Sequence, residues 1–86
     1  MPISIYKADY SETLATLGEA DWDLPKQICE LENWLVANEK ELTVGDYVAD
    51  IGFSVRKDAS GGGAALSPQS MKIMGSLGMS LFLSEY

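Results

Sequence analysis

The stretch Tyr47–Arg56, which reads YVADIGFSVR, decides the fold class. Tyr47, Ala49, Ile51, Phe53 and Val55 alternate along it with Val48, Asp50, Gly52, Ser54 and Arg56. Successive side chains of a β-strand point to opposite faces, so this period of two predicts a strand over Tyr47–Arg56. The strand is expected to belong to a sheet that has one covered face.

Two helices are predicted before this strand. Asp9 and Glu12 form a capping-box pattern, and Gly18 suits a left-handed helix end, which predicts a short helix over residues 9–18. Asp23 is expected to cap the longest helix, which fades near Asn38. The apolar stripe of this second helix consists of Leu24, Ile28, Leu31 and Leu35.

The remaining elements are three strands and one helix. Ile3–Ala8 and Met79–Tyr86 have the composition and alternation of strands, and Ala64–Leu66 is expected to return as a short edge strand in a hairpin. Ser67 followed by proline predicts the start of a last helix, which ends at Gly78.

Together these elements predict one α+β domain spanning residues 1–86. We expect a three- to four-stranded, mainly antiparallel sheet with two to three helices packed on one face. A chain of 86 residues has room for one hydrophobic core. With 47% hydrophobic and 22% charged residues, its composition is that of a folded protein, and no apolar run is long enough to cross a membrane.

The net charge of −7 is unevenly distributed. Asp9 to Asp50 contains eleven acidic residues and two lysines, a net charge of −9, whereas the chain from Ile51 onward carries +1. Such a field repels nucleic acid and attracts basic proteins. The six basic residues form no stripe along the chain, and nucleic-acid binding is not predicted.

The sequence offers little for catalysis. It contains no histidine, the most common general base near neutral pH and a frequent zinc ligand. Its single cysteine, Cys29, lies beside Ile28 of the apolar stripe and is expected to be a buried structural thiol. One cysteine forms no internal disulfide, which favours a cytoplasmic protein. We assign no catalytic residue and predict that the chain is not an enzyme.

Two segments resemble ligand-binding motifs only in part. Glu19, Asp21 and Asp23 alternate but lack the glycine and final glutamate of an EF-hand loop, so they are interpreted as a solvated helix entry. A metal-dependent enzyme using these acids remains a third alternative. The segment from Ser60 to Gly63 lacks the Gly-Lys-Ser/Thr of a phosphate-binding loop and is interpreted as a turn. We therefore predict no metal or cofactor.

The C-terminal half resembles an uncharacterised bacterial family of domains of unknown function. The residues that carry the resemblance are the strand Tyr47–Arg56, Asp58, Gly61–Gly63, Leu66-Ser67-Pro68, Met71, Met74, Gly78–Leu81 and Ser84–Tyr86. The similarity covers about half of the chain and implies a strand, a glycine-containing loop, a helix and a final strand. It implies a bacterial origin but no activity, and the N-terminal half is shorter than the family pattern.

The leading functional hypothesis is an immunity protein that neutralises a cationic bacterial toxin, such as a nuclease, by direct binding. Small size, acidity and the absence of catalytic groups are similar in character to such proteins. The predicted contact residues are Asp21, Trp22, Asp23, Glu30, Trp34 and Asp46, because aromatic side chains beside charges are frequent interface anchors. Core packing is the favoured alternative for Trp34. The alternative function is a homo-oligomeric module that pairs through an edge strand such as Met79–Tyr86 or Ile3–Ala8.

Overall fold

The computed structural model describes residues 2–18, 22–55, 57–58 and 60–86. In chain order the elements are β1 (Ile3–Lys7), β2 (Thr13–Leu17), α1 (Leu24–Asn38), the 3-10 turn η1 (Glu39–Glu41), β3 (Tyr47–Phe53), α2 (Pro68–Leu77) and β4 (Met79–Glu85). The predicted α+β class is confirmed.

The four strands form one mixed sheet in the order β2-β1-β3-β4. Strand β1 pairs antiparallel with β2 on one side and with β3 on the other. Strand β4 pairs parallel with β3, with Tyr47 opposite Met79 and Ile51 opposite Leu83. The sheet is therefore mostly antiparallel, as predicted, and β2 and β4 are its edge strands.

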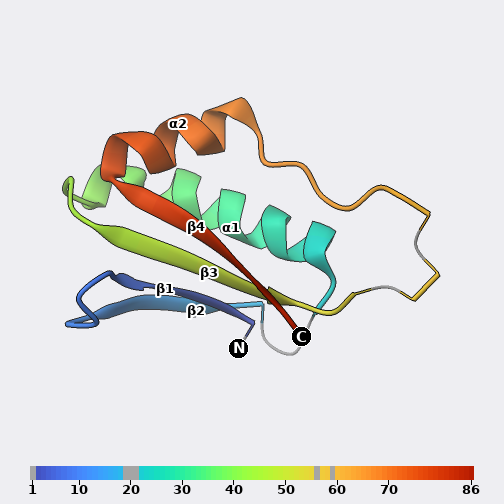
Figure 1. Cartoon of the computed structure of the whole chain (residues 1–86). Coiled ribbons are helices and arrows are strands. Elements are labelled where there is room, and N and C mark those ends of the chain that lie inside the picture. Colours follow the sequence, from blue (N-terminus) through green and yellow to red (C-terminus); the bar gives the residue numbers. More distant parts are fainter. Residues whose placement is uncertain (1, 19–21, 56, 59) are drawn as a thin grey trace.

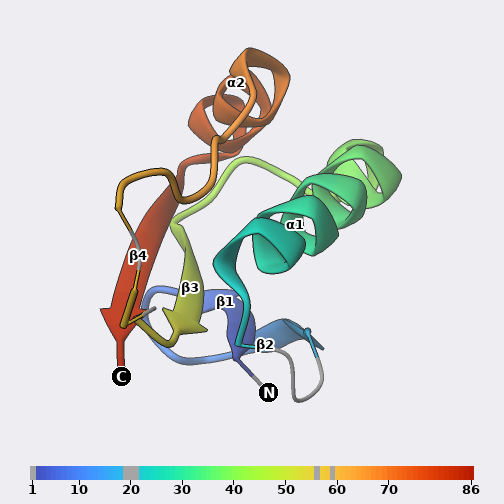
Figure 2. The same cartoon turned by 90° about the vertical axis from the view of Figure 1, so that its right-hand side faces the viewer.

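Both helices lie on the same side of the sheet (Figures 1 and 2). The core between the helices and this covered face consists of Ile3, Ile5, Ile28, Leu31, Leu35, Tyr47, Ala49, Ile51, Ile73, Met74, Leu77 and Met79. The strand residues in this set have the alternation that the sequence predicts for a half-covered sheet. Among the residues that the structure describes, none forms a helix on the opposite side of the sheet (Figure 2).

Helix α1 follows its predicted apolar stripe. Ile28, Leu31 and Leu35 are buried, and Leu24 packs at the edge of the core. Asp23 occupies the predicted N-cap position, where its carbonyl oxygen accepts a hydrogen bond from the backbone N–H of Gln27. The helix ends near Asn38 as predicted, but the Asp23 side chain makes no capping hydrogen bond.

Helix α2 begins and ends where the sequence predicts. The Ser67 hydroxyl accepts a hydrogen bond from the Ser70 N–H at 3.1 Å, and Pro68 occupies the first turn. Gly78 ends the helix in the left-handed conformation, with a φ of 81°. A side chain at this position would also collide with the carbonyl oxygen of Gly45, so two features of the site require glycine there.

A carboxylate on α1 joins the two helices. Glu32 Oε2 accepts hydrogen bonds from the Ser67 N–H at 2.8 Å and from the Ser70 hydroxyl at 2.7 Å. The Ser67 N–H, together with the Ser70 hydroxyl, holds the pKa of the Glu32 carboxyl below its ordinary value. The negative charge of Glu32 thus lies at the positive N-terminal end of the α2 dipole.

The short helix predicted over residues 9–18 is wrong. Thr13–Leu17 is strand β2, which forms a hairpin with β1, and Asp9 accepts a hydrogen bond from the Ser11 N–H instead of capping a helix. Hydrogen bonding from the Ser11 side chain, together with that from its backbone N–H, lowers the pKa of Asp9. A two-turn helix is marginal by itself, whereas pairing with β1 satisfies the backbone of a segment that contains two threonines.

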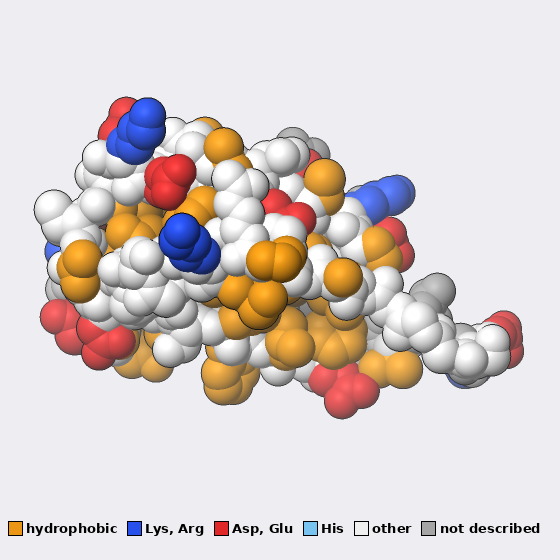
Figure 3. Space-filling model, turned by 90° about the horizontal axis from the view of Figure 1, so that it is seen from above, with side chains coloured by type: hydrophobic (Ala, Val, Ile, Leu, Met, Phe, Trp, Pro, Cys, Tyr) orange, Lys and Arg blue, Asp and Glu red, His pale blue; other side chains and the backbone are white. Residues whose placement is uncertain are grey.

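The predicted hairpin after β3 is also wrong. Strand β3 ends at Phe53, and residues 60–66 form no strand; Arg56 lies outside the described residues. Instead the chain before α2 runs away from the body of the molecule and then returns to α2 (Figure 1), and it forms a protrusion in the space-filling view (Figure 3). It carries the chain across to the start of α2, which allows β4 to lie parallel to β3.

Candidate functional site

The side of the sheet opposite the helices is the most distinctive surface of the chain, and we call it the open face. The pairing register assigns to it Ser4, Tyr6, Thr16, Val48, Asp50, Gly52, Ser80, Phe82 and Ser84. Among these nine positions Asp50 carries the only charge, and none is lysine or arginine. The open face therefore combines apolar and hydroxyl groups around one carboxylate.

A pair of tyrosines lies at one end of the open face. The rings of Tyr6 and Tyr10 stack with their centroids 5.4 Å apart and an interplanar angle of 17°. Tyr10 is 81% exposed and has a φ of 63°, a conformation that a bulky side chain rarely adopts. The tight turn that produces it is closed by a hydrogen bond from the Tyr10 N–H to the Lys7 carbonyl at 2.8 Å.

A second aromatic pair closes the other end. The rings of Trp22 and Tyr86 meet edge to face with centroids 5.3 Å apart, although the two side chains are 40% and 76% exposed. Both lie over Gly52, where an added Cβ would meet Tyr86 at 2.8 Å and Trp22 at 3.0 Å. Glycine at position 52 therefore allows this pair to rest directly on the strand.

The carboxylate of Asp50 lies between these pairs. Asp50 is half-buried, its Oδ1 accepts a hydrogen bond from the Ser84 hydroxyl at 2.6 Å, and Phe82 lies directly opposite on β4. Partial burial raises the pKa of Tyr6, and electrostatic interactions with the Tyr10 hydroxyl and the Asp50 carboxylate add to the shift. Phe82 is 59% exposed although it lies in the middle of its strand.

This arrangement is suited to binding a cation or a hydrogen-bond donor. Aromatic faces attract lysine and arginine side chains, and a half-buried carboxylate can accept their N–H groups. A strand face that combines exposed aromatic rings with small polar side chains is also typical of a protein contact surface. Within the described residues no group of three His, Cys, Asp or Glu side chains could hold a metal ion.

The six contact residues predicted from sequence do not form one surface. Trp22 borders the open face, but Glu30 is exposed on α1 and Trp34 packs half-buried against the core, both on the helix side. Asp23 is exposed at the start of α1, and Asp21 lies outside the described residues. The core-packing alternative for Trp34 is thus the one that its burial favours.

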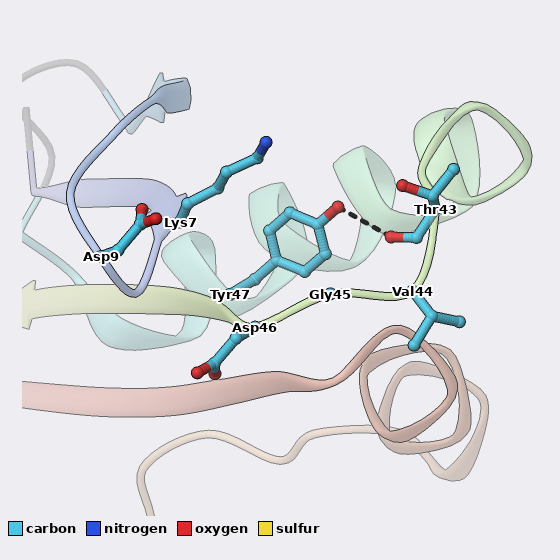
Figure 4. A pocket seen from close by; sticks show the side chains of 7 residues that line it. All are labelled: Lys7, Asp9, Thr43, Val44, Gly45, Asp46 and Tyr47. Carbon is cyan, nitrogen blue, oxygen red and sulfur yellow. Dashed lines mark hydrogen bonds between the residues drawn. The ribbon is translucent and has the colours of Figure 1, made fainter.

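Asp46 lies at the far end of the open face from Trp22. The intervening strand β3 has seven residues, which makes it about 20 Å long at about 3.3 Å per residue. Around Asp46 is a surface pocket of about 290 Å³ lined by Lys7, Asp9, Thr43, Val44, Gly45, Asp46 and Tyr47. In Figure 4 the Lys7 and Tyr47 side chains point to one side of β3 and Asp46 points to the other, so their polar groups do not converge on one ligand position.

Cys29 is exposed, and its prediction as a buried thiol is wrong. One residue advances an α-helix by about 100°, so the position after Ile28 leaves the apolar stripe and faces solvent. The Asn33 amide, one turn further along the same helix, donates a hydrogen bond to its sulfur at 3.9 Å.

Some residues of the open face could be identified from the sequence. Alternation placed Asp50 opposite the core residues of its strand, and it placed Phe82 and Tyr86 opposite Leu81. The packing of the helices on one face was predicted as well, but the order of the strands, which places β4 next to β3 and Phe82 beside Asp50, was not. Tyr6 and Tyr10 were missed as a pair since the turn that stacks them was predicted as helix.

This chain matches no protein-family model, no curated protein and no solved structure. No helix in the described part of the chain is long and apolar enough to cross a bilayer.

Proposed function

We propose that this chain is a non-catalytic binding protein that holds a basic protein partner against its open face. The form of this activity that best suits a small acidic domain is an immunity protein, which neutralises a cationic bacterial toxin by occupying its surface. Such an inhibitor acts in the cytoplasm of the cell it protects. The observation that carries the proposal is a half-buried carboxylate, Asp50, which lies opposite the exposed Phe82 and between two aromatic pairs, on a strand face that has no basic residue.

The geometry supports a basic partner in two steps. The net charge of −7 attracts a cationic protein at long range and accelerates its encounter with this chain. At short range a lysine or arginine of the partner can reach Asp50 while its aliphatic stem lies on Phe82 or Tyr6. The apolar part of the open face then excludes water from the contact, which strengthens the ion pair.

This proposal moves the contact from the helices to the open face. The acidic residues of α1, including Glu30, contribute to the long-range field but lie on the helix side of the sheet instead of on the open face. Trp22 remains in the proposed contact because it borders the open face, and Asp46 lies at its opposite rim. Rim charges change association rates more than affinity.

The test uses two variants that remove the same charge from different faces. Asp50→Asn and Glu30→Gln each delete one carboxylate, and we expect only the first to weaken binding to a purified basic partner, by at least about tenfold. Phe82→Ala should weaken binding as well. Calorimetry with the partner measures all three variants, after the partner is identified by capture on wild-type protein at low salt.

Three outcomes contradict the proposal. One is that no basic protein is captured from the source cells by wild-type protein. Another is that Glu30→Gln weakens binding as much as Asp50→Asn, which would place the contact on the helix side. If the partner is a nuclease and keeps its full activity when saturated with this chain, binding stands and inhibition is excluded.

A further inference from the structure

The outer edge of β4 lacks the features that usually protect an edge strand. Strand β4 has seven residues, Met79–Glu85, without proline, lysine or arginine and without a bulge in its register with β3. Phe82 and Leu83 are 59% and 52% exposed along it. The other edge strand, β2, has five residues and an irregular register with β1. A long, regular and apolar edge is a template for pairing with another strand.

The direction of the backbone groups on β4 can be derived from one hydrogen bond. The Tyr86 N–H donates to the Phe53 carbonyl at 3.0 Å and so points toward β3. Since the backbone groups of successive strand residues point to opposite sides, those of Ser80, Phe82 and Ser84 also point toward β3. The N–H and C=O groups of Leu81 and Leu83 therefore point outward, away from the sheet.

The sequence of this edge reads the same in both directions: Ser80-Leu81-Phe82-Leu83-Ser84. We propose that two copies of the chain pair antiparallel through β4, about a two-fold axis that passes at Phe82. In this register Leu81 of one copy lies opposite Leu83 of the other, so the outward-pointing N–H and C=O groups meet as a hydrogen-bonded pair. Ser80 lies opposite Ser84, and Phe82 lies opposite its own copy.

Every contact in this register joins compatible side chains. The two Phe82 rings meet on the open face at a non-hydrogen-bonded pair, where side chains approach most closely. Leu83 lies on the covered side of the sheet yet is half-exposed in one copy, and the pairing places it against Leu81 of the second copy. Glu85 lies opposite Met79 of the second copy, so like charges do not meet across the strand pair.

The dimer would have one continuous sheet of eight strands. Its two-fold axis would pass through the β4–β4 pair, with the open face of one copy on each side of it. It does not depend on the proposed partner, because it uses the edge of the sheet instead of the carboxylate of Asp50. A single strand pair makes a small interface, so we expect dissociation in the micromolar range. Because each copy carries −7, added salt should strengthen the dimer by screening their repulsion.

Sedimentation equilibrium over a range of protein and salt concentrations measures the dimer directly. We expect a monomer–dimer equilibrium whose dissociation constant falls as salt is added. Leu83→Pro removes an outward-pointing N–H from each copy, and should weaken the dimer at least about tenfold while the monomer stays folded, because edge positions with outward N–H groups tolerate proline. A single monomeric mass at every concentration and salt level overturns the proposal.

Disulfide trapping tests the register even if the proline variant does not fold. In a Cys29→Ser background, Phe82→Cys should form a covalent dimer on oxidation, because the paired α-carbons would lie about 4.5 Å apart. Ser80→Cys alone should not, since its two copies would be about 13 Å apart at about 3.3 Å per residue. An equal mixture of Ser80→Cys and Ser84→Cys proteins should cross-link. Equal cross-linking of Phe82→Cys and Ser80→Cys alone contradicts the register.

Discussion

The two faces of the sheet are made of the same strands, yet their residues serve different purposes. On β3 the covered face presents Tyr47, Ala49 and Ile51, which are all at least 96% buried. The strand residues that point to the other face include a half-buried aspartate, Asp50, and Gly52, on which two aromatic rings rest. Substitutions at the covered positions of β3 should therefore affect folding, whereas substitutions at the alternate positions should affect binding.

The covered face should be the more sensitive to substitution. Leu31→Ala removes a fully buried side chain from the centre of α1, and we expect a loss of about 2–5 kcal/mol in the free energy of unfolding. Denaturant unfolding followed by far-ultraviolet circular dichroism measures it. A loss below about 1 kcal/mol would mean that α1 is not packed on the sheet as described.

We expect the second-largest loss of stability when the hydrogen bonds from α2 to Glu32 are removed, and this loss should depend on pH. Glu32→Ala removes the acceptor for the Ser67 N–H and the Ser70 hydroxyl, so we expect a loss of about 1.5–3 kcal/mol near neutral pH. Because the folded-state pKa of Glu32 is lowered, its stabilising charge is present above the ordinary glutamate pKa and is lost as pH falls through the folded value. Glu32→Gln keeps an acceptor oxygen, so it should cost less than Glu32→Ala and should also reduce the loss of stability in acid. Urea titrations at several pH values compare the three proteins, and equal acid sensitivity in all of them would contradict the role of Glu32.

A substitution at Gly52, on which the Trp22–Tyr86 pair rests, tests the structure of this end of the open face. Gly52→Ala places a Cβ 2.8 Å from the Tyr86 ring and 3.0 Å from Trp22, so one or both rings must move. Both contacts involve side chains, and we expect a modest destabilisation of about 1 kcal/mol with a clear change in Trp22 fluorescence. The measurement requires a Trp34→Phe background, because the second tryptophan also emits. An unchanged spectrum would mean that Trp22 does not rest on Gly52.

The smallest effect on folding should come from the centre of the open face. Phe82→Ala removes a ring that is 59% exposed, and the free energy of unfolding should change by no more than about 0.5 kcal/mol at protein concentrations where the chain is monomeric. The same variant should weaken partner binding, which distinguishes the open face from the core. A destabilisation as large as that of Leu31→Ala would show that this face is part of the core.

The features predicted well from sequence are those determined by neighbours along the chain. The alternation around Ile51, the helical stripe that includes Leu31 and the serine–proline start of α2 each depend on a few adjacent residues. The failures depend on residues far away. Thr13–Leu17 is a strand because β1 is available to pair with it, and Glu32 caps α2 across 35 positions of sequence. The candidate site needed the same long-range information, since only the pairing of β3 with β4 shows that Asp50 and Phe82 are neighbours on one surface.

The parallel pairing of β3 and β4 also affects the order in which the chain can fold. Residues 3 and 17 of the first hairpin are 14 positions apart, whereas Tyr47 and Met79 are 32 positions apart and must wait for α2 to form the crossover. Closing the longer loop costs more conformational entropy, so the hairpin and α1 can assemble while one edge of β3 is still bare. During that interval the folding chain is most exposed to aggregation.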